Sequence, residues 1–304
     1  MTKNTISVII PTKNRPDDLI HAVASILDQK KLPNELIIVD QSDDKKSYQA
    51  VRKIFNNINI VLKLNYVYEP KIKGLVEAKQ KGVSIAKGGV VCFLEDDIVL
   101  DNNYFVNVSK IFEKQENLMG CCGVMTNNHS GNIYEILFKL FHLGIFYDAR
   151  LNIGKKKDCN GEVFLISSRF LSGGISCYRK NVFDNVSFDI RNDFHMLEDI
   201  DFSTRAADFY GDEHFFIVSN ICLKHNMSPV NREKLKYRWQ RKLREYVVYY
   251  KKNSFKPWAL INLIWLLVGM LGESVISSIL MRNLGPFIGT IIGLYHGVKK
   301  KVTL

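Results

Sequence analysis

The sequence predicts an α/β protein in which a mostly parallel sheet is flanked by helices and followed by a helical C-terminal region that faces a membrane. Short β-branched runs alternate with helical runs of ten or more residues in the N-terminal half, the pattern of βαβ units. The 304 residues are 46% hydrophobic, enough for one large or two modest domains. The longest apolar stretches and the excess of basic over acidic residues occupy the last quarter of the chain.

The elements of the N-terminal half follow from the local period of apolar residues. Strands are expected at 6–10, 36–39, 60–68 and 89–94, where β-branched and apolar residues run together. Helices are expected at 17–29, 48–55 and 74–86. Residues 121–217 are less regular, but no Pro/Ser-rich linker separates them, so we expect them to complete the same domain.

The positive charge is concentrated near the C-terminal end. Residues 224–256 hold eleven Lys and Arg and two acids, whereas residues 1–223 carry a net charge of −1. A helix is expected at 231–252, with one apolar side and basic residues around the rest. Such a segment suits nucleic acid or anionic lipid headgroups. The apolar stretches 258–281 and 284–298 that follow favour the membrane and argue against a nucleic-acid partner.

Two membrane arrangements of these apolar stretches remain open, and the alternative to both is a soluble helical domain that packs on the catalytic core. The first is long enough to cross a bilayer and the second is short. A hairpin would keep its lysine-flanked ends on the cytoplasmic side. Alternatively, both stretches lie in the interface, or their glycines pack closely in a homo-oligomer with Glu273 buried among protein groups.

Polar clusters follow the predicted strands, where ligands of parallel sheets bind. Glu95, Asp96 and Asp97 follow an apolar run, and three adjacent acids need a cation or full solvation. Such oxygen ligands suit Mg²⁺ or Mn²⁺, although an acidic helix cap is the alternative. Asp40 would bond a ribose hydroxyl or a base edge, or else form a turn. The sequence contains no Gly-rich phosphate-binding motif.

Four segments together resemble the family 2 inverting glycosyltransferases with the GT-A fold. They are SVIIPTKNR at 7–15, IIVDQS at 37–42, residues 74–82 and FLEDD at 93–97, and the likeness covers about residues 5–225. The resemblance implies that a nucleotide-sugar donor is bound by Pro11, Thr12, Asn14, Arg15, Asp40 and Asp96. Lys79 stands where the family commonly has Arg, and offers the donor only a point charge.

The resemblance also assigns the reacting groups. Asp97, with His225, would hold the metal that bridges the diphosphate, and Asp199 would be the general base, with Glu198 and Asp201 as alternatives. Separately, the segment Ser172, Gly173 and Gly174 would let the backbone approach the acceptor or donor sugar closely, or would form a plain tight turn.

The expected activity is therefore metal-dependent, inverting transfer of a hexosyl or deoxyhexosyl group to a saccharide or lipid-linked acceptor, for cell-surface glycan synthesis at the cytoplasmic face of the cell membrane. Residues 1–228 would form the catalytic domain, with a nucleotide-sugar half to about 120 and an acceptor half after it, and residues 229–304 the membrane region. One alternative is a nucleotidyltransferase-like enzyme, whose usual Gly-rich loop is missing after the first strand. Another is an inactive membrane-anchored scaffold, against which the joint presence of Asp40, Asp97 and Asp199 argues.

Overall fold

The computed structural model describes residues 5–57, 61–72, 74–127, 133–149, 162–230 and 233–303. The strand expected at 60–68 and the helix expected at 231–252 both begin outside these ranges. Within the described residues, each predicted strand and helix of the N-terminal half is present, with its ends displaced by a few residues at most.

The N-terminal half forms the predicted parallel βαβ units. In order along the chain these are β1 (Ile6–Thr12), α1 (Pro16–Leu27), β2 (Glu35–Asp40), α2 (Lys46–Asn56), β3 (Lys63–Tyr68), α3 (Leu75–Ile85) and β4 (Val90–Phe93). The strands lie in the order β3-β2-β1-β4 and all three contacts are parallel. Every residue of β1, β2 and β4 is buried, because helices cover both faces of the sheet.

The second half continues the same sheet with mixed strand directions. Its elements are β5 (Ile98–Leu100), α4 (Tyr104–Lys114), β6 (Gly120–Met125), α5 (Ile133–Phe141), η1 (Gly144–Phe146), β7 (Leu165–Ser167), β8 (Ser176–Arg179), α6 (Val182–Asn185), α7 (Glu198–Tyr210), η4 (Asp212–His214) and β9 (Phe215–His225). The order continues β4-β8-β6-β9-β5, with β7 beside β9. β9 runs antiparallel to β5, so that His225 pairs with Ile98. This register brings the end of β9 to the acids that follow β4.

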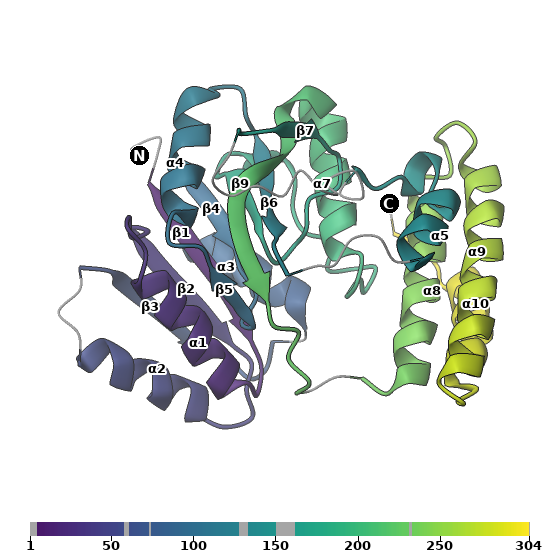
Figure 1. Ribbon diagram of the computed structural model, residues 1–304, viewed down its shortest axis with the longest axis horizontal. Helices are drawn as coiled ribbons and strands as arrows, with labels where there is room; N and C mark the ends of the chain where they lie inside the picture. The colour runs from purple at the N-terminus through teal and green to yellow at the C-terminus, as the bar shows by residue number, and fades with distance from the viewer. Residues whose placement is uncertain are drawn as a thin grey trace.

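Three helices complete the chain on the side of the molecule away from α1 and α2 (Figure 1): α8 (Leu235–Lys252), α9 (Ala259–Leu280) and α10 (Gly285–Lys299). α8 buries Leu243 and Val247 in a second hydrophobic cluster, which also contains Phe146 and Phe170 of the sheet-bearing part. α9 adds Leu266 to that cluster. The expected helical C-terminal region is therefore present, packed against the sheet-bearing part.

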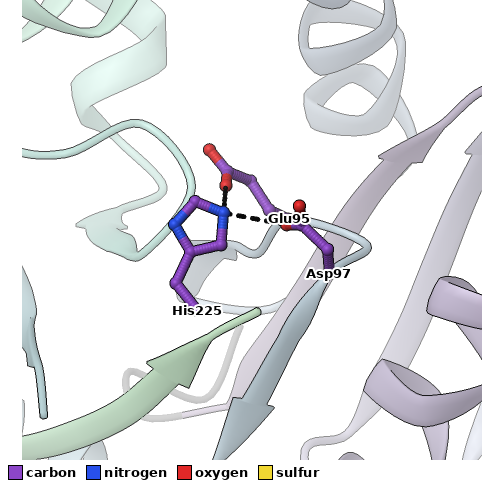
Figure 2. Close-up of side chains that lie close together, drawn as sticks. All are labelled: Glu95, Asp97 and His225. Atoms are coloured by element: carbon purple, nitrogen blue, oxygen red, sulfur yellow. Dashed lines mark ion pairs between the residues drawn. The ribbon is translucent and has the colours of Figure 1, made fainter. Parts of the chain in front are cut away.

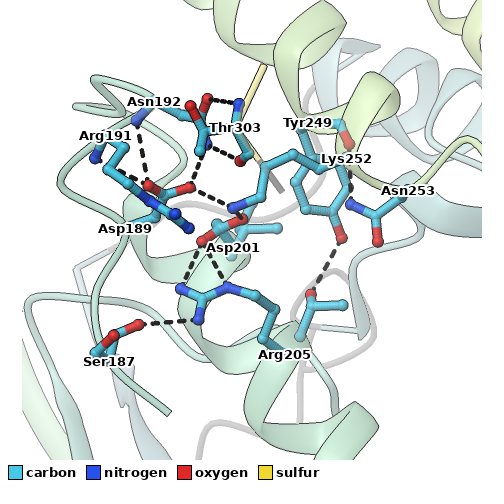
Figure 3. A network of polar contacts seen from close by, with 12 residues as sticks. Ser187, Asp189, Arg191, Asn192, Asp201, Arg205, Tyr249, Lys252, Asn253 and Thr303 are labelled. Atoms are coloured by element: carbon cyan, nitrogen blue, oxygen red, sulfur yellow. Dashed lines mark hydrogen bonds and ion pairs between the residues drawn. The ribbon is translucent and has the colours of Figure 1, made fainter.

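A buried polar network also joins α8 to α7 (Figure 3). Lys252 at the end of α8 pairs with Asp189 and Asp201, and all three side chains are less than a tenth exposed. Arg205 pairs with Asp201 from the other side, at 2.7 Å. Burial opposes ionisation of Asp189, but hydrogen bonds from Asn192 and Lys252 outweigh it and lower its pKa to about 2. The basic helix is thus tied to the helix that carries Asp199.

Candidate active site

Three side chains from two distant segments converge at the C-terminal edge of the sheet (Figure 2). Nε2 of His225 lies 3.0 Å from Oε2 of Glu95 and 3.0 Å from Oδ1 of Asp97. One ligand atom from each residue falls within 4.8 Å of the others. The turn after β4 supplies both acids, and β9 delivers the imidazole.

The electrostatics of this cluster fit a divalent cation. Oδ1 of Asp97 is buried and has no hydrogen-bond partner of good geometry among the described residues, although the His225 nitrogen is close. That nitrogen carries at most one proton and faces two carboxylates. Asp97 and then Glu95 raise the pKa of His225 to about 10, so the site favours positive charge strongly. Two carboxylates and an imidazole are ligands that Mn²⁺ accepts.

The other oxygen of Asp97 is held by the protein. Its Oδ2 accepts a hydrogen bond of 2.9 Å from the backbone N–H of Ser228, in the segment after β9. Burial opposes ionisation of Asp97, but His225 and this backbone N–H together lower its pKa. The carboxylate is therefore oriented with one oxygen fixed and the other aimed at the convergence point.

Asp96 faces the loop after β1. It accepts hydrogen bonds from Thr12 Oγ1 at 2.7 Å and Arg15 Nη1 at 3.1 Å, and is only 5% exposed. Burial raises its pKa to about 6 against the effect of Arg15 and Thr12. Arg15 also donates to the carbonyl of Val230. Three residues predicted to bind the nucleotide-sugar donor, Thr12, Arg15 and Asp96, therefore lie together in the structure.

Asp40 and Asn14 lie at the adjacent strand end. Asp40 is fully buried, and its carboxylate accepts hydrogen bonds from Tyr66 Oη at 2.6 Å and the Ser42 N–H at 2.9 Å. Asn14 has a φ of 55°, in the left-handed region that asparagine tolerates, and bonds to the loop after β2 through Asp43. Pro11 is buried as the penultimate residue of β1. Asp40 is therefore covered by protein at this edge of the sheet, where its hydrogen bonds hold Tyr66 and the backbone of Ser42.

The acidic pair at the start of α7 divides into two environments. Glu198 is 7% exposed and receives the ammonium of the buried Lys79 at 2.9 Å. Asp199 is half-buried, and its carboxylate accepts the backbone N–H groups of Gly173 at 2.9 Å and Ile200 at 2.8 Å. Lys79, predicted to contact the donor, pairs with Glu198 here and lies over the Phe93 ring at 5.6 Å.

Gly173 and Gly174 lie between Asp199 and the cluster of Glu95, Asp97 and His225, called here the metal-type cluster. A Cβ on Gly173 would lie 2.7 Å from the Asp199 side chain, and one on Gly174 would lie 2.3 Å from Glu95. The carbonyl of Gly174 accepts the Glu95 N–H at 3.1 Å. Close approach explains glycine at both positions, and places Asp199 and Glu95 on either side of one dipeptide. Ser172 precedes the pair and is half-buried.

The sequence profile of glycosyl transferase family 2 matches residues 7–186 of this chain, more than half of it, and covers the loops after β1, β2 and β4. The chain belongs to glycosyl transferase family 2. This confirms the resemblance seen in the sequence.

Two bacterial relatives illustrate the family membership. The uncharacterized glycosyltransferase YwdF of Bacillus subtilis is 26% identical over 206 residues, which are 67% of this chain and 69% of that protein. The GalNAc(5)-diNAcBac-PP-undecaprenol beta-1,3-glucosyltransferase of Campylobacter jejuni is 27% identical over 216 residues, 70% of this chain and 62% of its own length.

Solved structures share the fold at lower identity. S. aureus TarS in complex with UDP-GlcNAc superposes with a TM-score of 0.61 at 16% identity, covering 97% of this chain and 81% of that one. The mannosyltransferase PcManGT of Pyrobaculum calidifontis, in complex with GDP-Man and Mn²⁺, gives 0.57 at 13% identity and covers 96% and 85%. The expected GT-A-like fold is thereby confirmed.

Two contributors to the site escape sequence reasoning: Tyr66 holds Asp40, and Ser228 orients Asp97. The sequence names Glu95 as one of three adjacent acids suited to a divalent cation, and the structure places it beside Asp97 and His225. Tyr66 and Ser228 carried no usable signal, since their roles depend on which strands become neighbours.

Proposed function

We propose that this family 2 enzyme transfers a hexosyl or deoxyhexosyl group, with inversion, from a nucleotide-diphosphate sugar to a lipid-linked glycan acceptor at the cytoplasmic face of the cell membrane. The observation that carries this proposal is that the metal-type cluster and Asp199 lie on either side of Gly173 and Gly174. Inverting transfer needs these two parts: positive charge at the leaving diphosphate and one carboxylate at the acceptor.

In the proposed reaction the Asp199 carboxylate accepts the proton of the acceptor hydroxyl as that oxygen attacks the anomeric carbon. The backbone N–H of Gly173 keeps the carboxylate oriented. Glu198 is already neutralised by its ion pair with Lys79, so we assign the proton transfer to Asp199 and not to Glu198. Mn²⁺ or Mg²⁺, held by Asp97, His225 and Glu95, would supply Lewis-acid stabilisation of the diphosphate leaving group.

We assign donor binding to the loops after β1, β2 and β4. Thr12 and Arg15 already donate hydrogen bonds to Asp96 there, and Pro11, Asn14 and Asp40 lie at the neighbouring strand ends. Residues 1–228 constitute the proposed catalytic domain, with the donor half ending near residue 120. Ser172, Gly173 and Gly174 form the proposed acceptor wall.

The relatives support a lipid-linked acceptor. The Campylobacter enzyme is named for an undecaprenol-diphosphate glycan. So is WfaP of Escherichia coli, a UDP-Glc:alpha-D-GlcNAc-diphosphoundecaprenol beta-1,3-glucosyltransferase 29% identical over 118 residues. Cell-surface glycan assembly is the corresponding pathway class, and the apolar C-terminal helices suit an acceptor of this kind.

Asp97→Ala tests the metal assignment. Without this carboxylate the donor diphosphate loses its bridging cation, so we expect calorimetry with UDP-glucose and Mn²⁺ to show at least about tenfold weaker binding, and EDTA to act likewise on the unchanged protein. Glu113→Ala, at an exposed position on α4, should bind as the unchanged protein does. Equal donor affinity with and without Mn²⁺ would refute a metal-bridged diphosphate.

A further inference from the structure

The C-terminal helices α9 and α10 leave many large apolar side chains exposed. On α9 and α10 the outward side chains are Leu260, Ile261, Ile264, Trp265, Val268, Val275, Ile276, Ile279, Leu280, Phe287, Ile288, Ile291, Tyr295 and Val298, each more than a third exposed. Among the described residues of α9, no exposed side chain is charged. A surface of this extent, called here the α9/α10 face, marks an interaction site.

The orientation of α10 is fixed by its contact with α8. A Cβ on Gly289 would lie 2.3 Å from the carbonyl oxygen of Lys236, and one on Gly293 would lie 2.3 Å from that of Gln240. Farther along, Gly297 faces Val247. As α10 advances, its partners on α8 advance too, so the helices run parallel, side by side, with their backbones in close approach.

α8 cannot enter a bilayer core. It carries Lys236, Arg238, Arg241, Lys242 and Arg244 along the stretch that faces α10. Its apolar side is already buried against residues of the sheet-bearing part, including Phe146 and Phe170. Charged side chains at the membrane centre are strongly disfavoured. Because α10 lies along α8, a membrane-crossing α10 would draw this basic stretch to the same depth.

α9 is held side-on to the same unit. Its single acid, Glu273, pairs with Lys242 of α8 at 3.1 Å, and Gly269 packs against Phe141 of α5. At 22 residues α9 is long and apolar enough to cross a membrane by length and composition, about 33 Å. Its contacts nevertheless align it with α8 and α10, as Figure 1 shows.

Building on the membrane location in the proposed function, we propose that the α9/α10 face lies flat in one leaflet of an anionic bilayer, so that neither helix crosses. Charge supports a bilayer as the occupant, since Lys256 precedes α9, Arg282 lies in the turn, and Lys299 to Lys301 end α10. Basic residues at the ends of apolar helices match anionic headgroups. Trp258, Trp265 and Tyr295 are aromatic anchors typical of that depth.

Site-specific labelling distinguishes lying from crossing. The full chain with Asn283→Cys, in the turn between α9 and α10, or with Ser254→Cys, before α9, is treated with an impermeant maleimide in inverted membrane vesicles. We expect equal labelling at both positions above the background of the unsubstituted protein. Labelling of Ser254→Cys alone, with Asn283→Cys reacting only after detergent, would show a crossing hairpin and overturn the proposal.

Vesicle flotation tests the occupant. Ile264→Asp and Val275→Asp, at positions 54% and 42% exposed, should each lower binding to phosphatidylglycerol vesicles by at least about tenfold. Val61→Asp, at a fully exposed position just before β3, the edge strand of the sheet, is the matched control and should bind normally. Unchanged flotation, with a dimer converted to a monomer, would assign the face to a second copy. Neither readout involves catalysis, so failure of the sugar-transfer proposal would leave both results standing.

Discussion

At the residue scale, the two acids that open α7 differ in what neutralises them. Glu198 is buried against Lys79, whereas Asp199 is held by backbone N–H groups at a half-buried position. The oriented carboxylate of Asp199 suits proton transfer from an acceptor, whereas the buried ion pair of Glu198 with Lys79 suits a structural role.

Asp199→Asn should lower the transfer rate by a factor of about 10² to 10⁴, because the amide cannot take the proton. Its side-chain oxygen can still accept the Gly173 N–H, so donor affinity measured by calorimetry should be unchanged. Glu198→Gln is the informative neighbour, since it should lower stability by leaving Lys79 buried beside a neutral group. A variant Asp199→Asn that keeps half the original rate would disprove the assignment.

Glu245 on α8 predicts a pH effect on stability. Its carboxylate accepts the N–H groups of Met196 and Leu197, just before α7, and burial raises its pKa from 4.5 to about 7. The folded state therefore binds the proton more tightly than the unfolded state, so this group lowers stability as pH rises from about 4.5 to 7.

Glu245→Gln keeps an acceptor oxygen and removes the titration. Relative to the unchanged protein, this variant should gain thermal stability between pH 5 and pH 7, as measured by unfolding midpoints at both values. A difference between the two proteins that stays constant across this range would show that Glu245 does not titrate there.

At the element scale, the contact between α8 and α10 depends on helix glycines. Gly293→Ala should loosen this contact and lower the unfolding midpoint, because its Cβ would meet the carbonyl of Gln240 at 2.3 Å. Gly272→Ala in α9 is the matched control, since nothing lies within 4 Å of its added Cβ. Alanine is the better helix former, so this control should gain about 0.5–1 kcal/mol. Equal shifts in both variants would contradict close packing.

The sequence identified α9 and α10 as apolar segments but left their orientation open. Hydropathy and length depend only on the segment itself, and both allow a crossing hairpin. The proposal that neither helix crosses rests on the register of Gly289 on Lys236 and the pairing of Glu273 with Lys242. Those contacts join residues 31 to 53 positions apart in the chain, beyond the reach of a local pattern.

At the scale of the whole molecule, the parallel half of the sheet was predictable and the mixed half was not. Buried runs such as those of β1 and β2 alternate with helical segments, and this fixes βαβ units. The insertion of β8 between β4 and β6 follows from no such rule. For the same reason the sequence named Asp97 and His225, through a family resemblance, but not the contacts of Ser228 and Tyr66.

Removing residues 254–304 should affect more than membrane attachment. The second hydrophobic cluster loses Leu263, Leu266 and Met270 of α9, and α8 loses its contact with α10. We expect the shortened chain to leave membranes at high salt and to unfold at a lower temperature than the full chain in scanning fluorimetry. An unchanged midpoint would show that α9 and α10 are an independent appendage.

The position of β9 has a consequence for synthesis on the ribosome. This strand completes the sheet between β6 and β5, yet it is made about a hundred residues after both. Until residue 225 has emerged, the nascent chain exposes those two strands with unpaired edges, a state prone to aggregation. His225 is the last residue of β9, so the metal-type cluster forms only when β9 has paired with β6 and β5. Partly made chains would therefore have no assembled active site.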